Sequence, residues 1–279
     1  MTLEELMAGI IIPIDKPRQW TSFQAVNKVK AVIRNTFGLK KFKIGHAGTL
    51  DPLATGLLLI CVGKATKRID ELQAGEKVYT GTMVLGATTP CYDLERAIDH
   101  YYPYEHITPT LVEEARKQFI GDIEQVPPIF SAVKIGGQRA YQYAREAANG
   151  ETPPSPTAKT VHIEEFTITD FRPGRVTCEK VTCETNAPMS QFAHHSSLEI
   201  HRSQLTQFHK HPQGTVPDHL PQLDFRIRCG KGTYIRSIAR DMGLALDSGA
   251  FLSVLRREQV GTYTLSSAIN IDDLPALLT

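Results

Sequence analysis

The sequence predicts an α+β fold built on a largely antiparallel or mixed sheet. Segments with the two-residue alternation of half-buried strands occur beside segments whose apolar residues recur every three to four positions, as in amphipathic helices. The two kinds do not alternate regularly, so repeated strand–helix–strand units with a parallel sheet are not predicted. With 41% hydrophobic and 22% charged residues among 279, the chain can bury a sizeable core.

A strand and a helix are predicted at the N-terminus. Residues 9–14 form a short apolar run, which is typical of a buried strand. Thr21 or Ser22 can then cap a helix, whose apolar positions continue at helical spacing to Phe37. Gly38 follows directly and predicts the end of that helix.

A glycine-rich segment over residues 45–56 is the most informative feature of the chain. It contains three glycines, one histidine and one carboxylate, Asp51. Pro52 suits the first turn of a helix, so we expect residues 57–60 to be helical and Asp51 to lie at or beside the N-cap. Two interpretations of Asp51 remain open at this point: a carboxylate that caps a helix, or a catalytic carboxylate on a rigid loop.

The remaining elements are predicted from the same two patterns. In the helix that Thr108 opens, Leu111, Ala115 and Phe119 are expected to share one face, and Thr233 is expected to cap the last helix. The predicted helices are 64–74, 108–120, 139–148 and 233–246, and the predicted strands are 78–85, 161–169, 175–185 and 223–229. Residues 186–222 carry six histidines with little periodicity, and predict a loop-rich insertion.

The charge pattern is local, because the formal net charge is only +1. Six basic residues lie between positions 28 and 43, and no acid occurs between Asp15 and Asp51; a second basic cluster spans residues 64–68. Such clusters suit the phosphates of a nucleic acid. A solvated helix face explains them equally well.

The cysteines and the N-terminus favour a reduced, cytoplasmic protein. The number of cysteines, five, is odd, the first residues are acidic, and no apolar run approaches the length of a membrane span. Zinc is not expected, because Cys178 and Cys183 are five residues apart and the paired spacings of structural zinc sites are missing.

Residues 48–56, Gly-Thr-Leu-Asp-Pro-Leu-Ala-Thr-Gly, resemble the signature of the TruB family of pseudouridine synthases. This family modifies uridine 55 in the T-arm of tRNA. The resemblance implies the pseudouridine synthase fold, a central mixed sheet flanked by helices with the active cleft across it. It also implies that Asp51 is the nucleophile.

The resemblance implies two further catalytic residues. Tyr79, in Lys77-Val78-Tyr79, matches the family tyrosine that stacks on uracil and assists proton removal. Arg236, within residues 230–237, matches the arginine that orients the nucleophile and keeps it ionised. Without the resemblance, a half-buried strand tyrosine and a surface salt bridge would be the commoner interpretations.

The resemblance also implies a set of substrate-binding residues. His46 matches the histidine beside the flipped base, and residues 127–145 match a segment that grips the T-loop. For Lys16 and Leu255, a solvated lysine and a core leucine are simpler alternatives. The implied substrate-binding residues are His46, Lys16, Tyr234, Leu255, Asp93 and Lys134.

The sequence thus predicts an isomerase that needs no cofactor or metal and binds the T-arm of tRNA. We expect one catalytic domain over residues 1–279 without a C-terminal RNA-binding PUA domain, acting as a monomer with no obligatory protein partner and no membrane contact. One alternative is an RNA-binding module or chaperone that folds tRNA without modifying it. Another is a synthase of the same fold that acts on a different RNA.

Overall fold

The structure is a computed structural model that describes residues 1–146, 154–174 and 214–278. These residues form two compact units. The first unit contains residues 1–81, 226–231 and 254–279, and the second contains residues 82–225 and 232–253. The prediction of a single domain over the whole chain stays a prediction.

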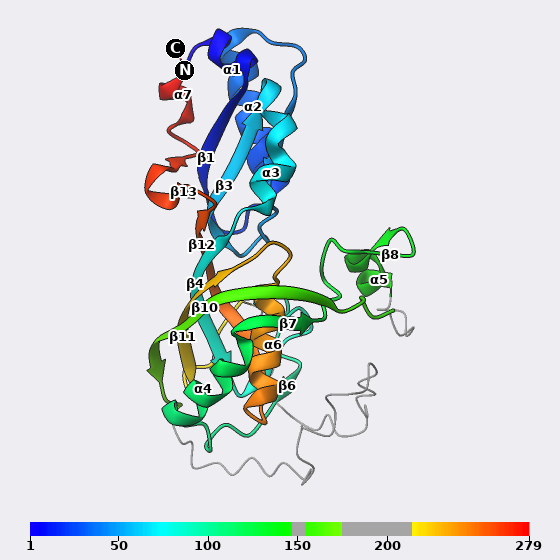
Figure 1. Ribbon diagram of the computed structural model, residues 1–279, viewed down its shortest axis with the longest axis vertical. Helices are drawn as coiled ribbons and strands as arrows, with labels where there is room; N and C mark the ends of the chain where they lie inside the picture. The colour runs from blue at the N-terminus through cyan, green and yellow to red at the C-terminus, as the bar shows by residue number, and fades with distance from the viewer. Residues whose placement is uncertain (147–153, 175–213, 279) are drawn as a thin grey trace. The chain divides into compact units, whose positions relative to one another are not determined.

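The first unit is a small sheet with helices on both faces (Figure 1). β3 pairs with β1 and β2 in antiparallel and with β12 in parallel orientation, while β14 pairs parallel with β1. Its elements are α1 Leu3–Gly9, β1 Ile10–Lys16, α2 Ser22–Phe37, β2 Ile44–Ala47, β3 Thr55–Val62, η1 Gly63–Arg68, α3 Ile69–Ala74, β13 Tyr263–Thr264, η6 Leu265–Ser267, β14 Ile269–Asn270 and α7 Leu274–Leu277.

Both faces of β3 are buried, and this explains its continuous apolar run. Leu58, Ile60 and Val62 belong to one hydrophobic cluster together with the buried face of α2. Leu57, Leu59 and Cys61 belong to the opposite cluster, together with Ala65 of η1 and Leu72 of α3. Successive strand residues point to opposite faces, so a strand covered on both sides needs apolar residues at every position.

The predicted helix over residues 57–60 is therefore wrong. A short apolar run occurs both in buried strands and in buried helix segments, so its sequence does not decide between them. The helix was predicted because Pro52 suits a first helical turn, and that signal was misleading here. Pro52 instead lies in a turn before β3, in which the Ala54 amide donates to the Asp51 carbonyl at 3.1 Å. Asp51 is consequently not a helix N-cap.

The other N-terminal predictions are confirmed. The first residues do form β1, and α2 begins after the Thr21 cap, whose hydroxyl accepts from the Gln24 amide. α2 ends at Gly38, which adopts a left-handed φ of 65°. The predicted helix over residues 64–74 is present as η1 followed by α3.

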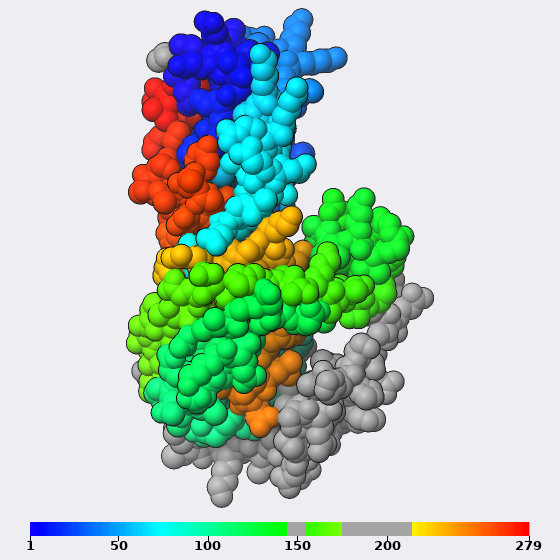
Figure 2. Space-filling model, viewed as in Figure 1, coloured from blue at the N-terminus to red at the C-terminus, as the bar shows by residue number. Residues whose placement is uncertain are grey.

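The two ends of the first unit lie side by side. The amino group of Met1 donates to the Leu277 carbonyl at 2.6 Å. Figure 2 shows the N-terminal segment in blue and the C-terminal segment in red sharing the surface of this unit.

In the second unit, α4 contacts both α6 and β10. Phe119, Phe166 and Phe225 form edge-to-face contacts in its core, with ring centroids 6.1 and 6.2 Å apart. Its elements, with the three strands that pass from one unit to the other, are β4 Lys77–Leu85, β5 Ala87–Thr88, β6 His100–Tyr101, α4 Pro109–Arg116, η2 Lys117–Phe119, β7 Gly121–Gln125, β8 Lys134–Ile135, β9 Gln138–Arg139, α5 Ala140–Glu146, β10 Lys159–Arg172, β11 Gln222–Cys229, α6 Ile235–Ala245 and β12 Ala250–Val260.

Two details of the second unit differ from the predictions. Ala115 of α4 and Phe119 of η2 are buried as predicted, but Leu111 is exposed and Val112 is the buried residue in its place. Thr233 does not cap α6; Tyr234 holds the N-cap position without a side-chain bond. The predicted strand 175–185 lies outside the described residues, as does the predicted insertion 186–222 except for its last residues.

The sheet confirms the predicted α+β fold class. Its hydrogen-bonded order is β14-β1-β3-β12-β4-β11-β10-β7, with parallel pairs β1–β14 and β3–β12 among antiparallel ones. The helices found in the described ranges include none long and apolar enough to cross a membrane.

Candidate active site

Asp51 lies on a short loop of the first unit, residues 48–54, which connects β2 to β3 and is called here the Asp51 loop. The Ser22 hydroxyl donates to the Leu50 carbonyl at 3.1 Å and accepts from the Leu50 amide at 2.9 Å. On the other side of Asp51, the Pro52 carbonyl accepts from the Gln19 amide at 2.8 Å. The residues that flank the carboxylate are therefore held by hydrogen bonds, while Asp51 itself is half-buried.

Lys16, at the end of β1, supports the same loop from a buried position. Its ammonium donates to the carbonyls of Pro17 at 2.9 Å, Trp20 at 2.6 Å and Pro52 at 3.3 Å. Burial lowers the pKa of Lys16 to about 8, and the charge of Asp51 opposes that shift. Lys16 is therefore not a solvated lysine, which was the simpler alternative. It is buried and contacts the backbone around the Asp51 loop.

Tyr79 of β4 and Leu255 of β12 are partly buried against the hydrophobic cluster that also contains Leu50 and Ala54 of the Asp51 loop. Burial raises the pKa of Tyr79, and Asp51 adds to the rise, so the side chain is a neutral phenol at neutral pH. The Thr55 hydroxyl donates to the Leu255 carbonyl at 3.5 Å, which links β12 to the end of the loop.

His46 of β2 precedes the Asp51 loop and is kept neutral. Burial lowers the pKa of His46, and the charge of Arg257 lowers it further, against a backbone hydrogen bond at Gly48. Its Nδ1 atom is buried and has no hydrogen-bond partner among the described residues. A neutral imidazole beside the loop suits the space-filling role that the resemblance implies.

Arg257 of β12 is the residue of this unit that the sequence analysis missed. It is 1% exposed, and its guanidinium donates from Nε to the Leu57 carbonyl at 2.8 Å and from Nη2 to the Gly48 carbonyl at 3.0 Å. A strand prediction through residues 250–260 could have found it, because an arginine then falls on a face that also carries apolar residues.

Arg236 is the central predicted residue of the second unit, on α6. Its guanidinium donates to the Cys91 carbonyl at 3.1 Å and to the Phe130 carbonyl at 2.9 Å. Its Nε lies 3.7 Å from Oδ2 of Asp93, and both side chains are buried. Asp93 is also fixed by accepting from the Glu95 amide at 2.9 Å. The structure therefore joins two predicted site residues in an ion pair, and the role of Arg236 toward Asp51 stays a prediction.

Tyr234 and Lys134 occupy different parts of the second unit. The Gln125 side chain accepts from the Tyr234 amide at 2.8 Å and donates to its carbonyl at 3.2 Å, which fixes the start of α6. Lys134 is exposed on β8, which pairs with β9 in a hairpin directly before α5 (Figure 1). Their substrate-binding roles stay predictions.

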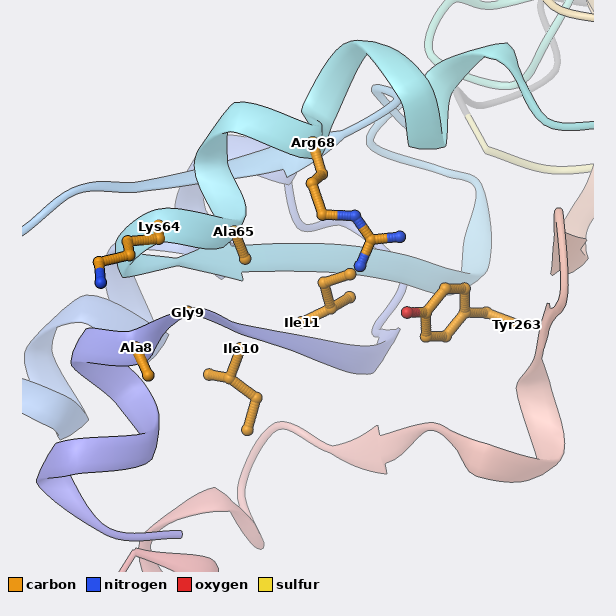
Figure 3. A pocket seen from close by; sticks show the side chains of 8 residues that line it. All are labelled: Ala8, Gly9, Ile10, Ile11, Lys64, Ala65, Arg68 and Tyr263. Carbon is orange, nitrogen blue, oxygen red and sulfur yellow. The ribbon is translucent and has the colours of Figure 1, made fainter.

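A cavity of about 330 Å³ lies elsewhere in the first unit and contains none of the predicted site residues. It is lined by residues of α1, β1, η1 and β13, and Figure 3 shows the side chains of Lys64, Arg68 and Tyr263 around it. Arg68 also forms an exposed ion pair with Glu71 at 2.9 Å. Within the described ranges, no group of three or more acidic, histidine or cysteine side chains is arranged to hold a metal ion.

Comparison with known proteins identifies the family. The family model described as "TruB family pseudouridylate synthase (N terminal domain)" matches residues 34–188. The chain belongs to the TruB family of pseudouridylate synthases. The matched residues include the Asp51 loop, so the resemblance stated from the signature is confirmed at the level of the family.

TruB-family relatives match almost the whole chain. The chain is 48% identical to the tRNA pseudouridine synthase B of Flavobacterium johnsoniae over 272 residues, covering 97% of this chain and 96% of the relative. It is 38% identical to the enzyme of the same name from Thermobifida fusca, covering 98% of this chain and 76% of the relative.

Solved structures support the fold. The TM-score is 0.59 against a Cbf5–Nop10–Gar1 complex, with 23% identity and coverage of 98% of this chain. A second match, an archaeal box H/ACA sRNP Nop10–Cbf5 complex, has a TM-score of 0.55 with 20% identity. This chain spans 55% and 54% of the matched chains, and at these identities the likenesses concern the fold alone.

Proposed function

We propose that this protein converts uridine 55 in the T-loop of tRNA to pseudouridine, with Asp51 as the nucleophile. The observation that carries the proposal is the Asp51 loop, in which Ser22 and Lys16 hold the backbone on either side of the half-buried Asp51. Tyr79 and Leu255 pack on the same hydrophobic cluster as the loop. The TruB-family relatives named tRNA pseudouridine synthase B supply the choice of tRNA.

The reaction breaks the bond between C1′ and N1 of the uridine and forms one between C1′ and C5. In one route, a carboxylate oxygen of Asp51 bonds to C1′, and the electron pair of the broken bond remains on the uracil. The uracil rotates, C5 attacks C1′ and releases the carboxylate, C5 loses its proton, and N1 gains one. In the other route, Asp51 adds to C6 of the uracil and the electron pair of the C5=C6 bond moves onto O4. The C1′–N1 bond breaks with its pair on N1, the uracil turns and C5 bonds to C1′. N1 gains a proton, and loss of the C5 proton expels the carboxylate from C6. Both balance without a cofactor or metal, and both remain open.

Tyr79 and Asp51 have complementary roles in this scheme. A neutral phenol cannot abstract the C5 proton as a phenolate, so Tyr79 is assigned to stack on the uracil and relay the proton through its hydroxyl group. Lys16 places a positive charge near Asp51, and the negative charge of Asp51 in turn opposes the lowering of the Lys16 pKa. Reaching the base requires flipping it out of the RNA loop, at a cost of a few kcal/mol.

The basic residues of α2 support tRNA binding. Lys28 and Lys30 lie on this helix with Arg34 in its last turn, and such side chains can pair with backbone phosphates. Shape recognition of the folded T-arm would supply the selectivity for this loop. We further propose that the chain acts as a cytoplasmic monomer without an obligatory protein partner.

Tritium release tests this proposal. Full-length protein is incubated with a tRNA transcript that carries tritium at C5 of uridine, and released tritium is measured for wild type and for Asp51→Asn. We expect the variant to lose at least about 1,000-fold in turnover while its tRNA affinity changes little. Asp70→Asn, which removes an exposed carboxylate of α3, is the matched control and should remain active.

Two results would contradict the proposal. Turnover retained by Asp51→Asn would remove Asp51 from the chemistry. If folded wild type binds the transcript without releasing tritium, the protein is a tRNA-binding chaperone or acts on another RNA.

A further inference from the structure

Arg257 is a buried cation whose position calls for an explanation. It is 1% exposed, and no acidic side chain in the described part of the chain forms an ion pair with it. Burying a guanidinium without a carboxylate costs several kcal/mol, which hydrogen bonds to carbonyl groups offset only in part. An apolar side chain at this point of β12 would be the cheaper way to fill the space.

The guanidinium holds both ends of the Asp51 loop. Nη2 donates to the carbonyl of Gly48, the first residue of the loop, and Nε donates to the carbonyl of Leu57, three residues after its end. A Cβ atom on Gly48 would lie 3.3 Å from Nη1, so the glycine allows the close approach. One planar guanidinium therefore bridges the backbone segments before and after Asp51.

The backbone of Arg257 is tied to the same place. Arg257 is the parallel strand partner of Gly56, two residues beyond the loop. Gly56 adopts φ of +100°, and a Cβ atom there would lie 2.3 Å from the Arg257 carbonyl oxygen. The backbone of Arg257 is thus fixed beside the two carbonyl groups that its side chain contacts.

The same guanidinium acts on the predicted site residues around the loop. It lowers the pKa of His46 and of Lys16, in each case in addition to burial. Its charge also opposes the rise that burial causes in the pKa of Tyr79. Because an arginine stays charged at every working pH, this influence is constant.

We infer that Arg257 is a positioning residue, which holds the two ends of the Asp51 loop together. The inference rests on the proposed function, since it explains how the nucleophile keeps its geometry. Arg257 itself contacts the backbone at both ends of the loop, and is not assigned a contact with the substrate.

The test compares Arg257→Lys with wild type. Lysine keeps the charge, but a single ammonium lacks the planar fork that reaches both carbonyls. We expect kcat for tritium release to fall about 100-fold, because small displacements of reacting groups have effects of that size. KM and tRNA affinity should stay within about threefold of wild type. Arg172→Lys, an exposed ion-pair residue of the second unit, is the control and should match wild type.

Hydrogen exchange supplies a readout that does not depend on activity. In Arg257→Lys, the amides of residues 48–57 should exchange at least about tenfold faster, while those of β1 and α2 keep wild-type protection.

The outcomes separate this inference from the proposed function. If kcat and loop exchange in Arg257→Lys equal wild type, Arg257 does not position the loop. If exchange rises throughout the first unit, its role is general stability and the inference fails. If wild type releases no tritium, the proposed function fails, and the exchange of residues 48–57 alone then decides whether Arg257 holds the loop.

Discussion

Gly56→Ala should be one of the most damaging single-methyl changes in this protein. Gly56 is buried at the start of β3, where its φ of +100° is a conformation that residues with a Cβ atom rarely adopt. The added Cβ would lie 2.3 Å from the Arg257 carbonyl oxygen and 2.8 Å from the Arg257 amide nitrogen. Both neighbours are backbone atoms of β12, so no side chain can turn away to make room.

The expected loss follows from two separate costs. A positive φ costs alanine about 1–2 kcal/mol. The clash costs about 1–3 kcal/mol more, because β12 must move about 1 Å to restore an ordinary contact. Together they predict a fall of about 2–5 kcal/mol in the free energy of unfolding. The same movement would displace Arg257 and the end of the Asp51 loop, so turnover should fall as well.

Gly38→Ala provides the matched control. Gly38 adopts φ of +65° at the end of α2, and an added Cβ would meet nothing within 4 Å. This variant should lose only about 1 kcal/mol, from the backbone conformation alone. Urea unfolding followed by the fluorescence of Trp20, the single tryptophan, reports on the first unit that contains both glycines. If the two variants lose the same stability within about 0.5 kcal/mol, the packing argument for Gly56 is wrong.

Two further changes test the supports of the Asp51 loop. Ser22→Ala leaves the buried amide and carbonyl of Leu50 without the hydroxyl group that bonds both, so the free energy of unfolding should fall by about 2–4 kcal/mol. The exposed Ser266→Ala is the control and should lose less than about 0.5 kcal/mol. Equal losses for the two variants in urea titration would show that the hydrogen bonds of Ser22 do not stabilise the loop. Lys16→Met tests the lowered pKa of Lys16. Between pH about 8 and 10.5 the unfolded chain keeps a proton on Lys16 that the folded chain releases. The contribution of Lys16 to the free energy of unfolding therefore rises with pH in this window. The stability of wild type relative to Lys16→Met should then grow by up to about 1.4 kcal/mol per pH unit in that window, and a constant difference would contradict the shift.

The local elements of the first unit could be predicted because their signals are local. The Thr21 cap, the helical spacing up to Phe37 and the Gly38 end each depend on neighbouring residues, and α2 has the predicted bounds. The Asp51 motif is also contiguous, so it identified the family before any long-range contact was known.

The errors arose where neighbours in space decide the structure. Residues 57–60 became a strand because β1, β2 and two layers of helix surround them, and no residue within the run carries that information. Leu111 is exposed for the same kind of reason, since the direction of a helix face depends on what packs against it.

By itself, the sequence determined the family, the fold class and the residue types available for chemistry, because each is written in short contiguous patterns. Only the tertiary structure decided what holds Asp51 in place. Ser22, Lys16 and Arg257 are separated from the Asp51 loop by as much as 209 residues, and their donors meet its carbonyl groups only after the chain has folded. A hydrogen bond depends on distance and direction in space, and sequence spacing specifies neither across such intervals.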